Sequence, residues 1–189
     1  LEVPSPETIG YFQCLMRHLV RLRLAVALFG SLSAVAASAQ DAGPLAALQA
    51  RGTNPEGPVA RRLASSDAVV ARAREQLGKR YRAASASPDH GFDCSGLVKF
   101  VLNGVCVDLP HNAARMAHEG EAVSADPSAL LPGDLLMFVR GRSARISHVG
   151  IYVGEGRMIH ASTAQRRVIE TALPSSLSSM KLRSVRRVL

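Results

Sequence analysis

The amino-acid sequence predicts an α+β domain in which N-terminal helices pack on an antiparallel sheet of about five to six strands. Apolar residues recur at helical spacing between residues 68 and 103. Five short runs rich in β-branched and aromatic residues follow between residues 135 and 188, and Gly, Pro or Ser residues separate them at hairpin-like spacing. Helices followed by such a series of strands are typical of this fold class.

The composition is that of one ordinary globular domain. The chain has 189 residues, of which 47% are hydrophobic and 20% charged, and its formal net charge is +8. A basic surface favours anionic partners, but the chain has no run of five or more like charges, so we expect no nucleic-acid partner. Three cysteines do not make a disulfide framework or a paired-cysteine zinc site, so a cysteine that matters would act through its reactivity.

Residues 1–39 are interpreted as an upstream extension followed by a secretory signal peptide. Three arginines precede an uncharged stretch over residues 24–40, and Ala37 and Ala39 form an A-x-A cleavage site. We expect cleavage after Ala39 and export to the periplasm or the cell exterior. The uncharged stretch is short for a membrane span, so we expect no stable span after cleavage, although a retained anchoring helix is an alternative.

Residues 40–64 are expected to form a flexible linker, and residues 65–189 the folded domain. The linker contains three Pro and three Gly and has no sustained periodicity. We therefore expect little ordered structure before residue 65.

The domain is predicted to contain three helices and then five strands. Gly78 is expected to stop the first helix, and Asp93 can cap the second, which places Cys94 at a helix N-terminus. Cys106, twelve residues later, is expected to be a buried packing residue. The predicted helices cover residues 68–77, 94–103 and 112–119, with a loop over 82–92. The predicted strands cover residues 135–139, 148–153, 157–161, 167–171 and 183–188.

Cys94 and two histidines form the candidate catalytic set. A helix N-terminus lowers the pKa of a thiol through its exposed N–H groups and dipole. A cysteine nucleophile also needs an imidazole within hydrogen-bonding reach and a third group to orient it. His148 and His160 lie on strands joined by the turn 154–156, so an antiparallel hairpin brings them near each other. We regard three other histidines of the predicted domain as mostly incidental, namely His90, His111 and His118.

Two other interpretations of these residue types remain open. Cys94 could be a buried structural cysteine. Alternatively, Cys94, His148 and His160 could bind zinc, although they lack the tight spacing that is usual for zinc ligands.

Four ordered motifs over residues 66–189 resemble the NlpC family of papain-like cell-wall cysteine endopeptidases. The motifs are GFDCSGLV at 91–98, LPGDL at 131–135, SHVGIY at 147–152 and MIHA at 158–161. The resemblance implies a papain-like domain whose nucleophile-bearing helix packs on an antiparallel sheet. It also implies hydrolysis of amide bonds in peptidoglycan stem peptides, commonly the γ-D-glutamyl to diaminopimelate bond, through a thioester acyl-enzyme and without a cofactor.

The resemblance also assigns roles to single residues. Cys94 would be the nucleophile, His148 the general base and His160 the orienting third residue. Tyr81 matches a family tyrosine whose hydroxyl helps to stabilise the oxyanion. The last two matches are Asp93 and Ser95, at family positions that contact the amino end of the substrate, although helix capping accounts for Asp93 equally well.

The sequence departs from the family pattern at two places. Residues 82–85 are Arg-Ala-Ala-Ser where a bulky aromatic and two glycines are usual, and residues 111–113 are His-Asn-Ala where an Arg and a hydroxyl residue are more typical. The first departure puts the substrate groove in doubt, and the second has no assigned consequence. The changed residues 82–85 make an amidase or acyltransferase on the same scaffold an alternative function. A catalytically silent cell-wall binding or regulatory module is a second alternative, and a protein activator could be a partner.

Overall fold

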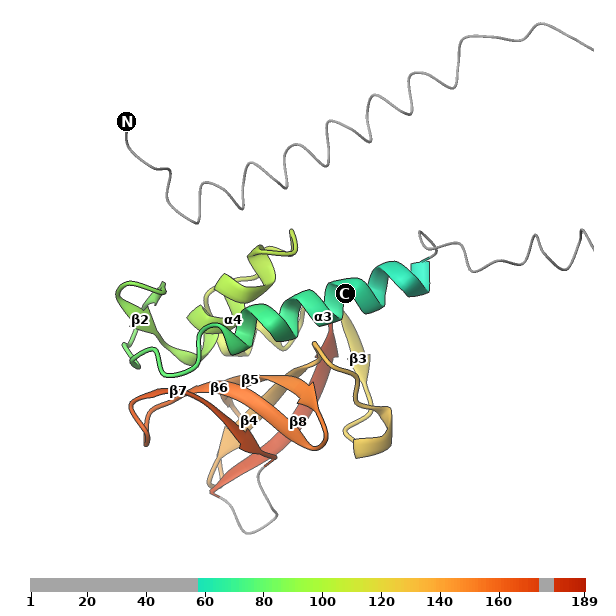
Figure 1. Cartoon of the computed structure of the whole chain (residues 1–189). Coiled ribbons are helices and arrows are strands. Elements are labelled where there is room, and N and C mark those ends of the chain that lie inside the picture. The colour runs from blue at the N-terminus through green and yellow to red at the C-terminus, as the bar shows by residue number, and fades with distance from the viewer. Residues whose placement is uncertain (1–57, 174–178) are drawn as a thin grey trace, which may run out of the picture. The chain divides into compact units, whose positions relative to one another are not determined.

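The computed structural model describes residues 58–173 and 179–189 and has the α+β architecture that the sequence predicts. Residues 62–189 form one compact unit, in which helices cover one face of an antiparallel sheet (Figure 1). The predicted signal peptide, its cleavage site and linker residues 40–57 lie outside the described residues. None of the described helices is both long and apolar enough to cross a membrane.

Helix α3 (Pro58–Arg74) starts ten residues before the expected first helical residue, so the predicted linker is helical from residue 58 onward. A proline suits the first position of a helix, where its missing N–H would have no intrahelical acceptor. Val69, Val70 and Ala73 are buried, as the periodicity predicts. The helix ends earlier than expected, and Leu77, which was expected on the buried face, is 41% exposed in the turn that follows.

The predicted loop at 82–92 contains a two-stranded hairpin, β1 (Ala86–Ser87) with β2 (Gly91–Phe92). Backbone hydrogen bonds join Arg82 to Phe92 and Tyr81 to Arg166. The segment that leads to the candidate nucleophile is therefore held by backbone bonds on two sides.

Helix α4 (Cys94–Asn103) confirms the predicted second helix and its N-cap. Its apolar side chains are buried in the core, among them Leu97, Val98, Val101 and Leu102. Two details differ from expectation. Helix α5 (Ala113–Met116), capped by Asn112, is shorter than predicted, and Cys106 is exposed and has a positive φ of 66° in the turn after α4.

The main sheet has six antiparallel strands in the order β3-β8-β4-β5-β6-β7. All five predicted strands are present, and β3, which pairs with β8, was not expected. A short 3-10 helix (Pro127–Ala129) follows β3. The strands are β3 (Glu121–Val123), β4 (Leu135–Arg140), β5 (Ile146–Gly154), β6 (Arg157–Ser162), β7 (Arg167–Ala172) and β8 (Met180–Arg187).

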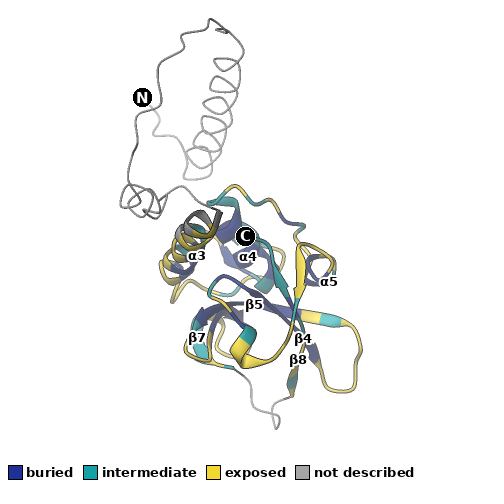
Figure 2. Ribbon diagram, turned by 90° about the vertical axis from the view of Figure 1, so that its right-hand side faces the viewer, coloured by how far each residue is buried: buried dark blue, intermediate teal, exposed yellow. Residues whose placement is uncertain are grey.

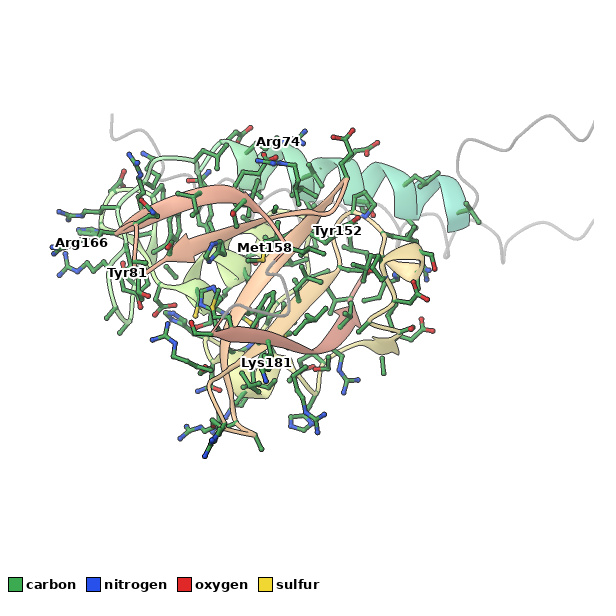
Figure 3. The ribbon with its side chains drawn as sticks, turned by 90° about the horizontal axis from the view of Figure 1, so that it is seen from below. Arg74, Tyr81, Tyr152, Met158, Arg166 and Lys181 are labelled. Atoms are coloured by element: carbon green, nitrogen blue, oxygen red, sulfur yellow. The ribbon has the colours of Figure 1, made fainter. Side chains whose placement is uncertain are left out.

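The central strands β4 and β5 are almost wholly buried, on both faces of the sheet (Figure 2). Alternate residues of a strand point to opposite faces. On β4, Leu135 and Met137 pack with the helices in the larger core, whereas Leu136 and Phe138 join a second apolar cluster. That cluster also contains the paired residues Tyr152 and Met158 of β5 and β6 (Figure 3).

Candidate active site

Cys94 is the first residue of α4 and carries a free thiol. The backbone N–H groups of Val149, Ser95 and Cys94 itself are near its sulfur, lower the pKa of the thiol and so favour the thiolate. Burial of the thiol raises its pKa by more than these N–H groups lower it, and the charge of the Asp93 carboxylate raises it further. The pKa of the thiol is therefore above its ordinary value of 9.0. The expected lowering by the helix N-terminus is therefore wrong as a net effect, because desolvation of the thiolate costs more than these N–H groups recover.

His148 and His160 form a buried hydrogen-bonded pair. Nε2 of His148 lies 2.7 Å from Nδ1 of His160, and the two rings meet edge to face, with their interplanar angle at 89°. Burial lowers both pKa values, to about 3 for His148 and about 4 for His160; the charges of His160 and Arg140 add to the effect on His148. Both imidazoles are therefore neutral near pH 7, so one nitrogen of the hydrogen bond donates and the other accepts.

The sheet register explains how the two histidines meet. Pairing of β5 with β6 begins at Ile151 and Ile159, and continuing this register sets Gly150 opposite His160. His148 therefore reaches His160 diagonally, past Gly150. A Cβ built on Gly150 would lie 3.4 Å from Cβ of His160 and 3.2 Å from Sδ of Met158. Glycine at this position therefore leaves the space between the two histidine side chains free.

The thiol and the histidine pair converge on the same part of β5. Val149, whose backbone N–H reaches the Cys94 sulfur, is the chain neighbour of His148 and lies outside the stretch of β5 that pairs with β6. The thiol thus lies at the end of a helix that packs against the two strands that carry the histidines. Cys94 is at the surface of a pocket, whereas His148 and His160 are not among its lining residues.

Asp93 organises the entrance to α4. Its Oδ1 accepts hydrogen bonds from the Gly96 backbone N–H at 2.7 Å and from the Ser95 hydroxyl at 3.1 Å, so helix capping is part of its role. His111 Nε2 lies 3.0 Å from both carboxylate oxygens. The interpretation of His111 as incidental is therefore wrong.

No local sequence signal links His111 to Asp93, which lies 18 positions earlier in the chain. The link depends on the segment after α4 running back along that helix. The Lys99 ammonium donates to the Asp108 carboxylate and to the Leu109 carbonyl oxygen, and it fixes this return path. Only the folded chain therefore reveals the contact.

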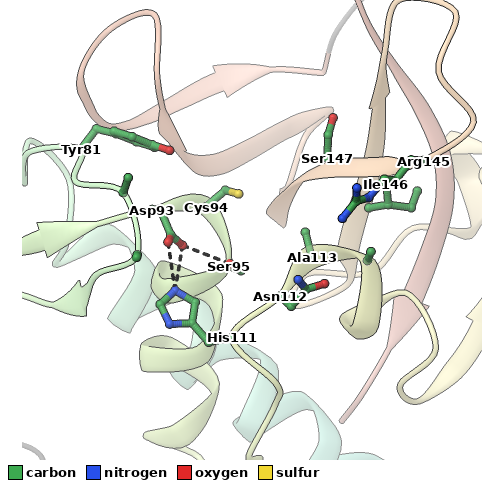
Figure 4. A pocket seen from close by; sticks show the side chains of 13 residues that line it. Tyr81, Asp93, Cys94, Ser95, His111, Asn112, Ala113, Arg145, Ile146 and Ser147 are labelled. Atoms are coloured by element: carbon green, nitrogen blue, oxygen red, sulfur yellow. Dashed lines mark hydrogen bonds and ion pairs between the residues drawn. The ribbon is translucent and has the colours of Figure 1, made fainter.

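Tyr81 lies beside Cys94, with its hydroxyl pointing toward the sulfur (Figure 4). Burial, followed by the charges of Cys94 and Asp93, raises its pKa above 10.0. The phenol is therefore protonated at neutral pH and can donate a hydrogen bond.

These groups surround a pocket of about 500 Å³. Residues of the hairpin segment and of the α4 N-terminus form one side, and residues of α5 and the start of β5 form the other (Figure 4). The lining residues are Tyr81, Ala83, Ala84, Asp93, Cys94, Ser95, His111, Asn112, Ala113, Ala114, Arg145, Ile146 and Ser147.

The departure from the family pattern at residues 82–85 falls on this pocket. Ala83 and Ala84 line it, and Ala84 has a positive φ of 53°, a conformation that favours glycine. The backbone thus keeps a left-handed position although the residue carries a Cβ. In the described part of the chain, no three His, Cys, Asp or Glu side chains are grouped so that they could hold a metal ion.

The chain is similar in sequence to known proteins. A probable endopeptidase of Mycobacterium tuberculosis is 44% identical over 96 residues, which is 51% of this chain and 23% of that protein. The γ-DL-glutamyl hydrolase of Bacillus subtilis is 36% identical, covering 68% of this chain and 32% of the relative. The murein DD-endopeptidase MepH of Escherichia coli is 34% identical, covering 61% and 43%.

Solved structures show the same fold. An NlpC/P60 family protein from Bacillus cereus matches with a TM-score of 0.59 and 29% identity, over 66% of this chain and 40% of that one. RipD of Mycobacterium tuberculosis, described as a non-catalytic NlpC/p60 domain protein adapted to peptidoglycan binding, matches with a TM-score of 0.54 and 25% identity, over 66% and 98%.

A helix that carries a thiol at its N-terminus and packs on an antiparallel sheet with paired histidines defines a papain-like α+β protein. The family model of the NlpC/P60 family matches residues 78–187, and the chain belongs to that family. The relatives named endopeptidase and murein DD-endopeptidase identify the family as one of cell-wall peptidases. The matched part spans less than half the length of each of the three curated relatives.

Proposed function

We propose that this protein is an exported cysteine endopeptidase that hydrolyses amide bonds in peptidoglycan stem peptides. One observation carries the proposal: the 2.7 Å hydrogen bond between His148 and His160, next to the backbone amide that contacts the Cys94 sulfur. A thiol, a base and a group that orients the base are the parts that nucleophilic catalysis requires.

The protonation states favour a general-base mechanism from a neutral resting pair. The His160 bond occupies Nε2 of His148 and leaves Nδ1 as the nitrogen that serves the thiol. The raised thiol pKa and the lowered imidazole pKa both favour Cys94–SH beside neutral His148 before substrate binds. His148 removes the thiol proton as sulfur attacks the amide carbon, then gives that proton to the leaving amine; water releases the acyl group.

Tyr81 and the Cys94 backbone N–H stabilise the oxyanion in this scheme. The phenol is protonated and lies beside the sulfur, where charge develops on the attacked carbonyl oxygen. A donor aimed at that oxygen lowers the barrier by about 3 kcal/mol in comparable enzymes.

In this proposal the bond hydrolysed is the γ-D-glutamyl to diaminopimelate bond of a stem peptide. Asp93 and Ser95 contact the amino end of that peptide. The relatives named γ-DL-glutamyl hydrolase and murein DD-endopeptidase support the substrate class. Export to the periplasm or the cell exterior is part of the proposal, because peptidoglycan lies outside the cytoplasm.

The deciding experiment digests peptidoglycan and defined muropeptides with the purified protein and with its Cys94→Ala variant. Mass spectrometry of the products identifies the bond. Cleavage by the wild type alone supports the proposal, whereas a transferred acyl group or a released amide would indicate an acyltransferase or amidase. Equal cleavage by both proteins would exclude Cys94 as the nucleophile.

A silent cell-wall binding module is the second candidate. The raised pKa of the Cys94 thiol and the altered pocket segment at 82–85 favour it, and the similarity to RipD, described as non-catalytic and adapted to peptidoglycan binding, supports it. It predicts peptidoglycan binding that survives Cys94→Ala, with no cleavage and no alkylation of Cys94 by iodoacetamide.

A further inference from the structure

Arg145 and Asp93 line opposite sides of the pocket (Figure 4). In Figure 4, Cys94 lies between two sets of side chains, with Tyr81 and Asp93 on one side and Arg145 and Ser147 on the other. An amide bond held over the Cys94 sulfur therefore has an anionic group toward one end and a cationic group toward the other.

The arginine belongs to a basic turn whose charges are not neutralised by neighbouring acids. The β4–β5 turn, residues 140–145, contains Arg140, Arg142 and Arg145 and has no acidic residue. Within the described ranges, none of these three arginines forms an ion pair with a carboxylate. The guanidinium of Arg145 is therefore available to an external anion.

The backbone that carries Arg145 is anchored. Its N–H donates to the Ser143 hydroxyl at 3.1 Å, and the next residue, Ile146, begins β5 and packs against the larger core. The charge thus projects from a fixed wall of the pocket. Exposed guanidinium groups bind carboxylates through paired charge-assisted hydrogen bonds, which also select geometry.

We propose that Arg145 determines specificity by binding a free carboxylate on the leaving-group side of the scissile amide. The inference rests on the proposed function, and it adds the substrate class: peptides in which the amino acid released as amine keeps an unmodified carboxylate. Amidation of that carboxylate would remove the charge that Arg145 recognises.

The reach of the site agrees with a carboxylate close to the cut. Arg145 is four residues before Val149, which contacts the sulfur, so its Cα is about 13 Å along the strand from that amide. An extended peptide residue covers about 3.5 Å, and the long arginine side chain can close the remaining gap. The carboxylate recognised is then on the first or second residue after the scissile bond.

The test compares two tripeptides, L-Ala-γ-D-Glu-diaminopimelate as the free acid and the same peptide with both diaminopimelate carboxyls amidated. We expect the wild type to prefer the free acid about tenfold in kcat/KM, the lower end of a charged hydrogen bond's effect. Arg145→Gln should abolish the preference and Arg145→Lys should keep part of it. Arg142→Gln is the matched control, because Arg142 lies in the same turn but does not line the pocket.

The same preference is measured as a ratio of Kd values on the Cys94→Ala background, which binds without cleaving. This arm separates the two proposals. Tighter binding of the free acid that depends on Arg145 supports the inference even when hydrolysis fails. Equal affinity and equal rates for the two peptides would overturn the inference and leave the peptidase intact. An equal loss in Arg145→Gln and Arg142→Gln would also overturn it, since it would indicate general attraction by the basic turn.

Discussion

At the scale of single residues, burial determines the chemistry of the site more than charge does. The pKa of the Cys94 thiol is raised and the pKa values of His148 and His160 are lowered, and desolvation is the largest cause for all three. The thiol and both imidazoles are therefore neutral at rest, and in the proposed mechanism proton transfer occurs only when a substrate is attacked.

His111 provides a prediction at this scale. Its ring holds both oxygens of Asp93, so we infer that it is a positioning residue for the proposed amino-end contact. His111→Ala should raise KM about tenfold with little change in kcat, because one charge-assisted hydrogen bond to the carboxylate is lost. Steady-state kinetics on a peptide with a free amino terminus measures this.

His111→Gln, which can still donate one hydrogen bond, is expected to recover part of the affinity. Acetylation of the substrate amine should remove the difference between wild type and His111→Ala. A fall in kcat without a change in KM would contradict the positioning role.

At the scale of elements, the first turn of α4 is held by a helix cap, a backbone hydrogen bond and a close backbone contact. The Asp93 side chain caps it, and the backbone N–H of Asp93 donates to the Ser85 carbonyl oxygen. A Cβ built on Gly96 would lie 2.1 Å from that same oxygen and 2.9 Å from Nε2 of His111. The absence of a side chain at 96 thus allows the pocket segment to approach the helix.

Gly96→Ala should therefore destabilise the fold by about 2 kcal/mol despite the higher helix propensity of alanine, because backbone must move. Gly104→Ala is the matched control. It follows the same helix at a negative φ of −64°, and the three atoms nearest to its Cβ would belong to the Arg72 side chain and not to backbone. Urea unfolding compares the two variants. Equal midpoints would show that the backbone at Ser85 moves aside at no cost in stability and would contradict the prediction.

A buried ion pair between Asp134 of the LPGD motif and Arg187 joins the start of β4 to the end of β8. Arg187 Nε and Nη2 donate to the two oxygens of Asp134 at 2.8 and 2.7 Å, and Asp134 is 1% exposed. Asp134 also accepts from the Leu131 backbone N–H at 2.9 Å. Its role is therefore structural, and it lies outside the lining of the Cys94 pocket.

Asp134→Ala should lower the free energy of unfolding by about 3–5 kcal/mol, because the partly buried Arg187 charge loses its carboxylate and keeps only the Ala129 carbonyl oxygen as a hydrogen-bond acceptor among the described residues. Asp108→Ala removes the carboxylate of an ion pair to Lys99 whose aspartate side chain is 77% exposed, and it should cost less than about 1 kcal/mol. Thermal or urea unfolding tests the pair of variants. A small effect of Asp134→Ala would mean that water replaces the carboxylate.

At the scale of the whole molecule, the buried histidines make stability depend on pH. Their pKa is 6.5 in the unfolded chain and about 3 and about 4 in the fold, so the unfolded state binds up to two more protons as the pH falls through 6.5. The free energy of unfolding should therefore fall on acidification from pH 6.5 to pH 5, by at most about 3 kcal/mol per pH unit. Above pH 9 it should fall again, since the unfolded thiol ionises before the buried one.

Urea unfolding between pH 5 and pH 10 measures both limbs. The double variant His148→Leu/His160→Leu should show a much flatter acid limb, and Cys94→Ala a flatter alkaline limb. An acid limb of wild-type steepness in the double variant would assign it to other groups.

Much of the architecture follows from local sequence patterns. Helical periodicity and the Asp93 cap predict α4, and short runs rich in β-branched and aromatic residues between turn residues predict β4 to β8. The same local patterns fail at α3, which extends back to Pro58, and at β3, a three-residue exposed strand that exists because it pairs with Arg187, Arg186 and Val185. Short edge strands carry little signal of their own, since their stability comes from the partner.

The sequence by itself determined the α+β class, the helix-terminal Cys94 and the hairpin that brings His148 near His160, because these depend on contacts between residues close along the chain. Only the tertiary structure decided the protonation of the thiol, the attachment of His111 to Asp93 and the opposition of Arg145 to Asp93 across the pocket. Those properties arise from burial and from segments that meet only after folding.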